Sequence, residues 1–558
     1  MKTSKKERFS GRSGLLCSVG ETIRQDFDKM PIGDYCHTDG APEGAVYEEA
    51  NMTSEDGRVL STREPRRYAE WIPSGAVSLG EYGGRLCRAE GRSFYYDGEQ
   101  VPDLTLPLSA DVKRRFSCFD GYVIVMPDKY YYQPSTGAFG SLEAEITCVA
   151  DVLMDTAEVY IPFEKRDGTV DFTKLFREGD RVRLKIQYLP QQSTVPQAYD
   201  LFITVKGKIY PYSIAFDPEV FPMTQDAVGA TVTVSRRMPD LEGTCVCNDR
   251  LFGYAGNTVY ASMRGNVFNW HPLGLSEDEA YEKNTAHGEA FTACTVYQGK
   301  PVFFTETMIS TVYGDSPEGY SVVDEPLWGV LSGAADSLVS MGGQLYYLSP
   351  HGVTVYDGDE ATVLSDSLGG RILSGSAGSD GRSYFLSAEM ERDGATSHYN
   401  FVYSLKTGQW HREDRSVFYD LICCDRVLYG LWSDPESNKL RLYALGGHTD
   451  RSPYTYAVEP SDLYSFVEFA DCTTDTSRHT GGGLRLKRLL VRLEADANTV
   501  ARVYLSCDGK ESRLVKKITA TEKQDVIIPV FPNRCHRYRI TLKVLGRFKL
   551  YAIGRMYG

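Results

Sequence analysis

NDRLFGYAGNTVYASMRGNVFNW, residues 248–270, is the stretch of this chain that decides the fold. Two aromatic-rich runs flank the tight turn at Gly256 and Asn257, and a polar turn follows that ends on Trp270. Aromatic and β-branched residues favour strands, and Gly-Asn steps favour hairpin turns. The stretch therefore predicts two adjacent strands of a β-hairpin.

The same unit recurs along the chain: an apolar strand, a turn with Gly or Asp, an aromatic strand and a further strand closing on a similar turn. Strands joined by short turns at repeats of about 40 residues are typical of propeller blades. We therefore predict a six- or seven-bladed β-propeller, whose strands are half-buried where residues alternate, as in 344–347. The copies of the unit lie at 83–98, 115–132, 248–270, 291–316 and 337–359, with weaker ones at 378–414 and 421–445.

Two segments depart from the repeat. The segment FREGDRVRLKI (176–186) has a Gly-Asp turn before an alternating strand, which is typical of a small barrel inserted in a loop. Long alternating strands near the C-terminus predict a β-sandwich of jelly-roll type. The predicted domains are an N-terminal arm (1–50), the first part of the propeller (51–143), an inserted small β-domain (144–220), the second part of the propeller (221–459) and the sandwich (460–558). Within the first part, EDGRVLSTREPRR (55–67) is predicted to hold a strand that completes the propeller ring.

Charge and composition argue against several classes of function. Among 558 residues, 61 are Lys or Arg and 75 are Asp or Glu, which gives a net charge of −14. Such a chain repels nucleic acid and anionic membranes unless basic residues cluster. No apolar run approaches the length of a membrane helix, so we expect folding in the cytosol without membrane insertion.

Motifs for catalysis or metal binding are missing from the sequence. The nine His residues are scattered, the 13 Cys residues form no paired CxxC, and neither a nucleophile elbow nor a phosphate-binding loop occurs. We therefore predict no metal, no cofactor and no enzymatic activity. The alternative is a glycosidase, since propellers host pairs of catalytic carboxylates. The nearest sialidase-like turn, Gly378 to Leu386, lacks the expected spacing and does not repeat, which favours an ordinary surface turn.

Several ordered pieces carry a resemblance to a known family: NMTSEDGRVLSTREPRR, GRSFYYDG, FGSLEA, VSRRMPDLEGTCVCNDRLFGYAGNTVYASMRGNVFNW and GVTVYDGD. Together they resemble a structural protein family encoded in tailed phages and prophages of Firmicutes. More distantly, the hairpin is similar to the propeller segment of phage tail nozzle or tail tubular proteins. The likeness covers most of residues 50–445, and VIIPVFPNRCHRYRITLKVLG is similar to the C-terminal sandwich of the same group.

This resemblance implies a non-enzymatic virion protein of the phage tail, the head–tail neck or the tail tip, made in the bacterial host cytoplasm. It further implies a homo-oligomer that forms or joins a ring, with other tail or neck proteins as partners. DNA would pass through without sequence-specific binding, which an acidic lumen favours. The alternative function is a receptor- or glycan-binding tail module, because propellers and jelly rolls both serve as lectins.

The candidate interface residues are Tyr130, Tyr131, Tyr132, Arg250 and Trp270. Tyrosine offers amphipathic contact area at a low entropic cost, so the run of three tyrosines suits a protein interface or a carbohydrate platform. Equally, alternate tyrosines of the run can fill the space between neighbouring blades. The sequence leaves both readings of the tyrosines open.

Overall fold

The computed structural model describes residues 24–558 except 55, 56, 58, 167, 191–193, 275, 435, 438, 447–453, 461, 474–484 and 531–534. The chain divides into two compact units, described separately below: the 72–338 unit, and the 339–558 unit, which also contains the residues up to Trp71. Nearly all regular structure is β, with one short helix, α1 (Phe172–Leu175), and three 3-10 turns, η1 (Phe163–Lys165), η2 (Ala335–Ser337) and η3 (Asp366–Leu368). No helix in the described part of the chain is long and apolar enough to cross a membrane.

Seven small antiparallel sheets make up the propeller among the described residues, and the predicted repeats all fall within them. Six sheets have four strands and one has five. Within the four-stranded sheets, strands that are consecutive in sequence are neighbours, which is the meander of a propeller blade. The prediction of a propeller with six or seven blades is therefore confirmed, and the number of blade sheets is seven.

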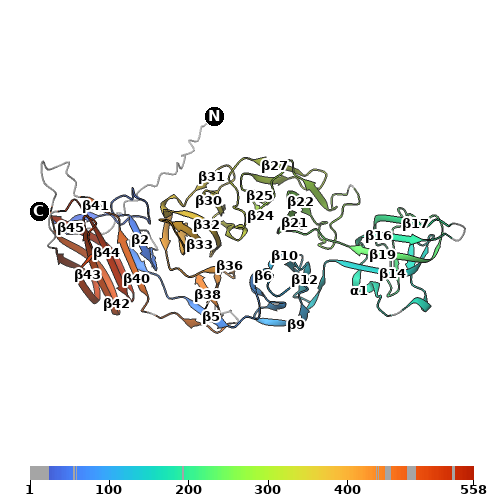
Figure 1. Ribbon diagram of the computed structural model, residues 1–558, viewed down its shortest axis with the longest axis horizontal. Coiled ribbons are helices and arrows are strands. Elements are labelled where there is room, and N and C mark those ends of the chain that lie inside the picture. Colours follow the sequence, from blue (N-terminus) through green and yellow to red (C-terminus); the bar gives the residue numbers. More distant parts are fainter. Residues whose placement is uncertain are drawn as a thin grey trace, which may run out of the picture. The chain divides into compact units, whose positions relative to one another are not determined.

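Four blades belong to the 72–338 unit, where the first strands of successive blades, β6, β10, β20 and β24, contact one another. Figure 1 shows these blades from blue to olive. Their strands are β6 (Val77–Tyr82), β7 (Arg85–Glu90), β8 (Ser93–Tyr96), β9 (Glu99–Thr105), β10 (Arg115–Phe119), β11 (Tyr122–Met126), β12 (Tyr130–Gln133), β13 (Ala138–Ser141), β20 (Gly243–Cys247), β21 (Arg250–Ala255), β22 (Thr258–Ala261), β23 (Tyr281–Asn284), β24 (Ala293–Tyr297), β25 (Lys300–Phe304), β26 (Ile309–Tyr313) and β27 (Ser321–Glu325).

Three blades belong to the 339–558 unit, and the last of them is completed by a strand from the N-terminal part of the chain. The prediction that segment 55–67 holds this strand is wrong, because the strand in that segment, Leu60–Thr62, belongs to the C-terminal sandwich. The strand that completes the blade is β5, which begins at Arg67 and pairs with β38 at Ala69 and Leu442. The strands are β28 (Val339–Met341), β29 (Gln344–Ser349), β30 (Gly352–Tyr356), β31 (Ala361–Val363), β32 (Arg371–Ser379), β33 (Ser383–Arg392), β34 (Ala395–Ser404), β35 (Gln409–Arg412), β36 (Phe418–Cys424), β37 (Val427–Ser433), β38 (Leu440–Gly446), β5 (Arg67–Trp71) and β39 (Ala457–Val458).

The middle strands of the blades are buried on both faces. In β21, Leu251 packs against the β10–β13 blade, whereas its neighbour Phe252 packs on the opposite face against the β24–β27 blade. In β29, Leu345, Tyr346 and Tyr347 are all buried, so the prediction that this strand is half-buried is wrong. Alternation implies one solvated face, but a blade strand that is covered on both sides needs apolar residues at every position.

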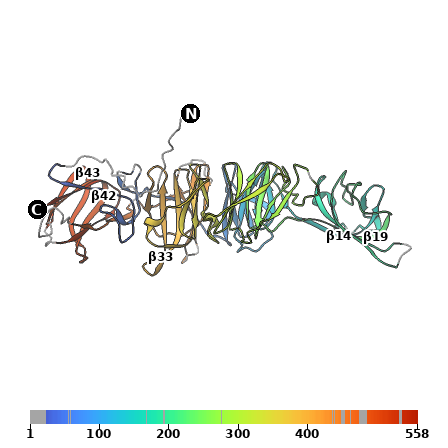
Figure 2. The same cartoon turned by 90° about the horizontal axis from the view of Figure 1, so that it is seen from above.

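The inserted domain is a six-stranded sheet within the 72–338 unit, in the order β17-β16-β19-β14-β15-β18. A bridge between Val205 and Phe216 brings its two ends together, so the sheet is a nearly closed barrel. The domain ends at Arg236 rather than at the predicted residue 220, because β19 pairs along the whole of β14 (Figure 2). Its strands are β14 (Ala144–Leu153), β15 (Glu158–Tyr160), β16 (Arg181–Tyr188), β17 (Gln197–Thr204), β18 (Ser213–Ala215) and β19 (Ala227–Arg236).

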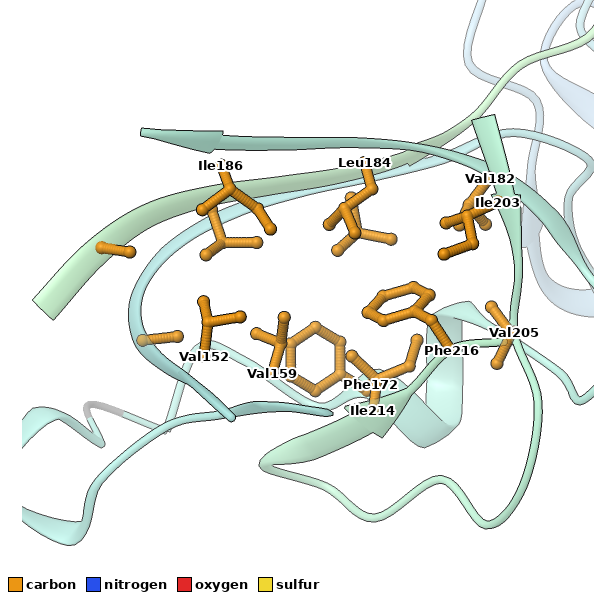
Figure 3. Packing of buried hydrophobic residues seen from close by; sticks show 14 of the residues in the cluster. Val152, Val159, Phe172, Val182, Leu184, Ile186, Ile203, Val205, Ile214 and Phe216 are labelled. Carbon is orange, nitrogen blue, oxygen red and sulfur yellow. The ribbon is translucent and has the colours of Figure 1, made fainter. Parts of the chain in front are cut away.

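The insert has its own apolar core. Figure 3 shows Leu184 and Ile186 from β16 facing Val152 and Val159 across the barrel, with Phe172 of α1 beside them. Alternate residues of β16 are buried, as the alternating sequence 181–188 requires for a sheet with one solvated face. The insert therefore has the self-contained core of a small domain.

The C-terminal sandwich is a ten-stranded network that includes N-terminal strands. The long strand β42 has register breaks between Leu493 and Val500, and its first part pairs with β45 whereas its second part pairs with β44. It thus serves both layers, alongside β43 (Figure 2). Of the predicted arm 1–50, residues 1–23 lie outside the described residues, and β1 and β2 are strands of this sandwich. The strands are β1 (Asp28–Met30), β2 (Val46–Ala50), β3 (Met52–Thr53), β4 (Leu60–Thr62), β40 (Tyr464–Phe469), β41 (Cys472–Thr473), β42 (Leu486–Cys507), β43 (Arg513–Pro529), β44 (Arg537–Leu545) and β45 (Phe548–Tyr557).

Candidate functional site

Arg250 organises the long loop between β22 and β23. Its side chain is fully buried, and its guanidinium donates hydrogen bonds to the carbonyl oxygens of Ser262 (2.8 Å), Glu277 (2.6 Å) and Glu279. Burial lowers the pKa of this guanidinium. A planar group with five donors can hold several carbonyls at once, so Arg250 fixes both ends of the loop to the blade.

Trp270 and its neighbour Asn269 connect that loop to the inserted domain. The indole of Trp270 is buried, and its Nε1 donates to the carbonyl oxygen of Val267 at 2.7 Å. The Asn269 side chain donates to the carbonyl oxygen of Gly179 (3.0 Å) and accepts from the amide of Arg181 (2.9 Å). The loop of the repeat hairpin is therefore a docking platform for the insert.

Tyr131 contributes to the same junction from the neighbouring blade. Its ring meets Phe268 edge-on, with centroids 5.4 Å apart. Arg177 of the insert lies over the Phe268 ring at 4.2 Å and donates to the Tyr131 hydroxyl at 3.2 Å. Tyr131 is thus an interface residue within the chain, between a blade and the insert.

One ion pair crosses this junction, and a second lies next to it within the insert. Arg181 on β16 pairs with the buried carboxylate of Glu279 at 2.7 Å. Arg236, at the end of β19, pairs with Asp180, and both side chains are almost fully buried. Burial raises the pKa of Asp180 and lowers the pKa of Arg236, so each charge depends on its partner. Removing one partner of such a buried pair typically costs about 3–5 kcal/mol, so this pair stabilises the insert next to the junction.

The five predicted interface residues thus divide by burial. Arg250 and Trp270 lie inside the fold, so they hold the junction loop instead of offering a surface to another protein, which corrects their assignment as interface residues. Tyr132 is buried between the first two blades, 5.4 Å from the ring of Phe94, which confirms the space-filling alternative for this residue. Tyr130 is half-buried against the same cluster, and its contact with another protein stays a prediction. Sequence reasoning missed Asp180, Glu279 and Asn269, whose roles depend on contacts between segments distant in sequence.

The insert exposes an unusual number of large apolar side chains. The most exposed are Phe163 (81%), Val228 (71%) and Val195 (66%). Single apolar residues on a surface are common, and the described residues of the insert include nine of them. We call them the exposed apolar set of the insert: Val149, Leu153, Phe163, Leu189, Val195, Phe202, Tyr210, Val220 and Val228.

A depression of about 560 Å³ lies beside the starts of β10, β20 and β24 and includes Glu242, Glu289 and Glu306. A glycosidase needs one carboxyl group that holds a proton and a second that does not. The Thr307 hydroxyl lies 2.8 and 3.0 Å from the two carboxylate oxygens of Glu289, and this hydrogen bonding lowers the pKa of Glu289. Glu242 and Glu306 accept backbone amides, from Gly256 at 2.9 Å and Ser332 at 2.8 Å. These carboxylates serve local turns.

Other candidate chemistry also has structural explanations. In the turn at 378–386, Asp380 accepts hydrogen bonds from the amides of Arg382 and Ser383, both at 2.9 Å, so it closes a hairpin between β32 and β33. His271 stacks on Phe202 of the insert, with ring centroids 3.5 Å apart, and burial lowers its pKa. No group of three His, Cys, Asp or Glu residues suited to a metal ion occurs among the described residues.

Comparisons with known proteins leave the family of this chain open. No family model matches, and no curated protein matches. Among solved structures, the chain is similar to an exo-β-1,3-galactanase from Phanerochaete chrysosporium (12% identity, 55% of this chain, 95% of that chain, TM-score 0.21). It is also similar to the Myceliophteria thermophila Cps50 (Swd1) β-propeller domain (9%, 68%, 100%, 0.27) and to an arabinoxylan arabinofuranohydrolase from Bacillus subtilis (10%, 87%, 96%, 0.16). At these TM-scores the likenesses support no inference about activity.

Proposed function

We propose that this chain is a non-enzymatic structural protein of a phage virion. It acts in the tail, the neck or the tail tip, where it forms or joins a ring around the DNA path. The resemblance of its ordered repeats to tail proteins of Firmicutes phages is the first support. Its role is geometric: a rigid set of blades carries two further β-domains that contact neighbouring proteins.

The observation that carries this proposal is the fixed attachment of the insert together with its exposed apolar set. The junction combines an ion pair between Arg181 of the insert and the buried Glu279 of the blade loop with an arginine stacked on Phe268. A domain held in this way cannot swing freely, and the apolar side chains it exposes fit a protein contact in an assembly. A flexible binding module would need neither feature.

The depression at the blade starts supports the non-enzymatic part of the proposal. Its three carboxylates all accept hydrogen bonds from the chain itself, and the lowered pKa of Glu289 makes this group unsuited to act as a general acid. Beside them, Asp336 pairs with Arg115 at 3.0 Å and Lys113 at 2.7 Å. Burial alone would raise the pKa of Asp336, but Lys113 and Arg115 together bring it below its ordinary value, so this carboxylate is ionised as well.

The test is cryo-EM of intact particles released from a producing host, with this chain sought in the density. We expect a symmetric ring along the DNA path, with the insert against a neighbouring subunit. A chain found only at the distal tip, with aromatic pockets facing outward, would favour receptor or glycan binding instead. Particles that are complete and infectious without the chain would overturn the proposal.

A paired variant adds an independent readout. We expect Phe163→Asp with Val228→Asp to leave the purified protein folded, because both side chains are exposed, and to stop its incorporation into particles. The matched control is Leu108→Asp with Val323→Asp, which changes exposed apolar residues of the blades. Incorporation of the insert variant at the normal level would contradict an assembly role for the exposed apolar set.

A further inference from the structure

The C-terminal segment of the sandwich, residues 460–558, has the opposite charge to the rest of the chain. Residues 460–558 hold 18 Lys or Arg and 10 Asp or Glu, a net charge of +8. The remaining residues hold 43 Lys or Arg against 65 Asp or Glu, a net charge of −22. Opposite charges on two parts of one chain favour contact between the basic part of one copy and the acidic part of another.

Three basic residues lie side by side across one layer of the sandwich. Arg502 in the middle strand, β42, is the direct cross-strand partner of Lys517 on β43 and of Lys543 on β44. Directly opposed residues lie on the same face of a sheet, a few ångströms apart. We call Lys517, Arg502 and Lys543 the cationic row.

Apolar residues flank the cationic row on both sides. One neighbouring row contains Val500, Leu545 and Tyr464 beside Thr519, and the other contains Leu514 and Tyr504 and continues through Thr541 to Glu468. Tyr464 and Leu514 are about half exposed, at 50% and 51%, whereas Ala501 and Val503, which point to the other face, are buried. The open face of this layer therefore places apolar side chains on both sides of three positive charges, with Glu468 at the end of one neighbouring row.

No carboxylate among the described residues forms an ion pair with the cationic row; Lys543 lies over the Tyr504 ring at 5.3 Å. Glu468, at the end of the neighbouring row, pairs with Arg539 at 2.8 Å instead. Like charges placed directly opposite one another destabilise a sheet. A partner that brings carboxylates to the row would remove this repulsion and cover the apolar rows.

We infer that this face of the sandwich binds the acidic part of a second copy of the chain, in a head-to-tail contact. The apolar rows favour a protein surface over a nucleic acid, whose phosphates would leave Leu514 and Leu545 in water. The charge of −22 outside residues 460–558 makes another copy a complementary partner. A head-to-tail contact joins unlike surfaces and forms a ring when its rotation closes, so this inference rests on the assembly role proposed above.

The first experiment measures self-association by sedimentation velocity at about 50 mM and about 500 mM salt, since exposed charges are strongly screened at the higher value. We expect the wild type to associate at low salt and to dissociate at high salt. The triple variant Arg502→Glu, Lys517→Glu, Lys543→Glu should weaken association at least about tenfold, because three attractions become repulsions. The control Lys208→Glu, Lys283→Glu, Arg382→Glu changes the same residue types and net charge at exposed sites elsewhere and should associate normally.

The second experiment locates the contact by carbodiimide coupling of lysine amines to carboxylates in a mixture of ¹⁴N- and ¹⁵N-labelled protein. We expect mixed-isotope links from Lys517 or Lys543 to Asp or Glu residues outside 460–558. A wild type that stays monomeric at low salt, or a row variant that associates like the control, would overturn the inference. So would binding of duplex DNA by the row with no self-association. If the chain were still found in virions after such a result, the proposed assembly role would remain, and only the role of this sandwich face in self-association would be rejected.

Discussion

At position 250 the chain buries an arginine completely and pairs it with backbone oxygens instead of a carboxylate. Three carbonyls, from Ser262, Glu277 and Glu279, converge on one guanidinium. The loop that these carbonyls belong to carries Phe268 and Asn269, which contact the insert. A single side chain in the repeat hairpin therefore controls a junction between two domains.

We expect Arg250→Ala to lower the free energy of unfolding of the 72–338 unit by about 3 kcal/mol or more, because it leaves three carbonyls unpaired and opens a cavity. Urea titration followed by tryptophan fluorescence measures the effect. Arg85→Ala removes an exposed arginine from its ion pair with Asp97 and should change stability by less than about 1 kcal/mol. Equal effects of the two substitutions would contradict the role of Arg250.

Asp414 gives a prediction about acid stability. It pairs with Arg66 at 2.8 Å and with Arg63 at 3.5 Å. Burial alone would raise its pKa, but the two arginines lower the pKa to about 2. Because the pKa of Asp414 is lower in the folded state than in the unfolded chain, where it is about 3.9, the ionised carboxylate stabilises the protein at pH values above about 3.9. This stability is lost as the pH falls toward 2.

We expect Asp414→Asn to cost about 2 kcal/mol at pH 7, because the carboxylate's favourable interactions are lost. The difference from the wild type should shrink between about pH 4 and pH 2, where the wild-type carboxylate itself becomes protonated. Chemical denaturation at a series of pH values measures this difference. Asp240→Asn, at a highly exposed carboxylate, is the control and should show little effect at any pH. A difference that stays constant down to pH 2 would refute the pairing of Asp414.

Among the strands, β5 completes a blade whose other strands lie far from it in sequence. It lies between β38 and β39, so a strand from before the first blade completes the last one. Its partner β38 lies more than 360 residues away in sequence, as the pairing of Ala69 with Leu442 shows. Forming this pairing closes a very long loop, which costs conformational entropy. The pairing of β5 with β38 therefore depends on an uninterrupted hydrogen-bond ladder.

We expect Ala69→Pro to destabilise the 339–558 unit by about 3 kcal/mol or more, since proline removes a ladder donor within a sheet. Hydrogen exchange should rise in β38. The matched control is Ala457→Pro in the two-residue strand β39, which lies at the edge of the same sheet and is exposed. If β38 stayed as protected as in the wild type, β5 would not hold the blade together.

Across the whole molecule, the insert is attached at two neighbouring points. Ala144, the first residue of the insert's first strand, and Arg236, the last residue of its last strand, are direct cross-strand partners. Their Cα atoms are therefore about 5 Å apart, a gap that a very short linker can span. The insert also has its own core, so its removal need not disturb the packing between blades.

We expect replacement of residues 145–235 by Gly-Gly to give a folded protein that no longer enters particles. Circular dichroism and hydrogen exchange of β10 and β21 measure the fold, and mass spectrometry of purified particles measures incorporation. Some loss of stability is expected, because Phe268 and Asn269 lose their contacts with the insert. A folded deletion variant that assembles normally would show that the insert is dispensable for assembly.

Local patterns in the sequence predicted the repeats well. Every hairpin signal of the blade type corresponds to strands of a blade, because glycine and aspartate turns and aromatic runs act within a few residues. The same reasoning placed the end of the insert too early, since β19 looks like any other strand until its pairing with β14 is known. Sequence reasoning also expected one solvated face in β29, because no short sequence pattern indicates that neighbouring blades bury both faces of this strand.

The sequence by itself determined the β class, the seven repeats, the presence of an insert and the change of pattern near the C-terminus. Each of these depends on residue type and short spacing. Only the tertiary structure decided that Arg250 and Trp270 are internal, that β5 completes the last blade and that Arg502 lies between Lys517 and Lys543. These facts depend on contacts between segments far apart in sequence, where the pairing energy comes from partners that no local pattern identifies.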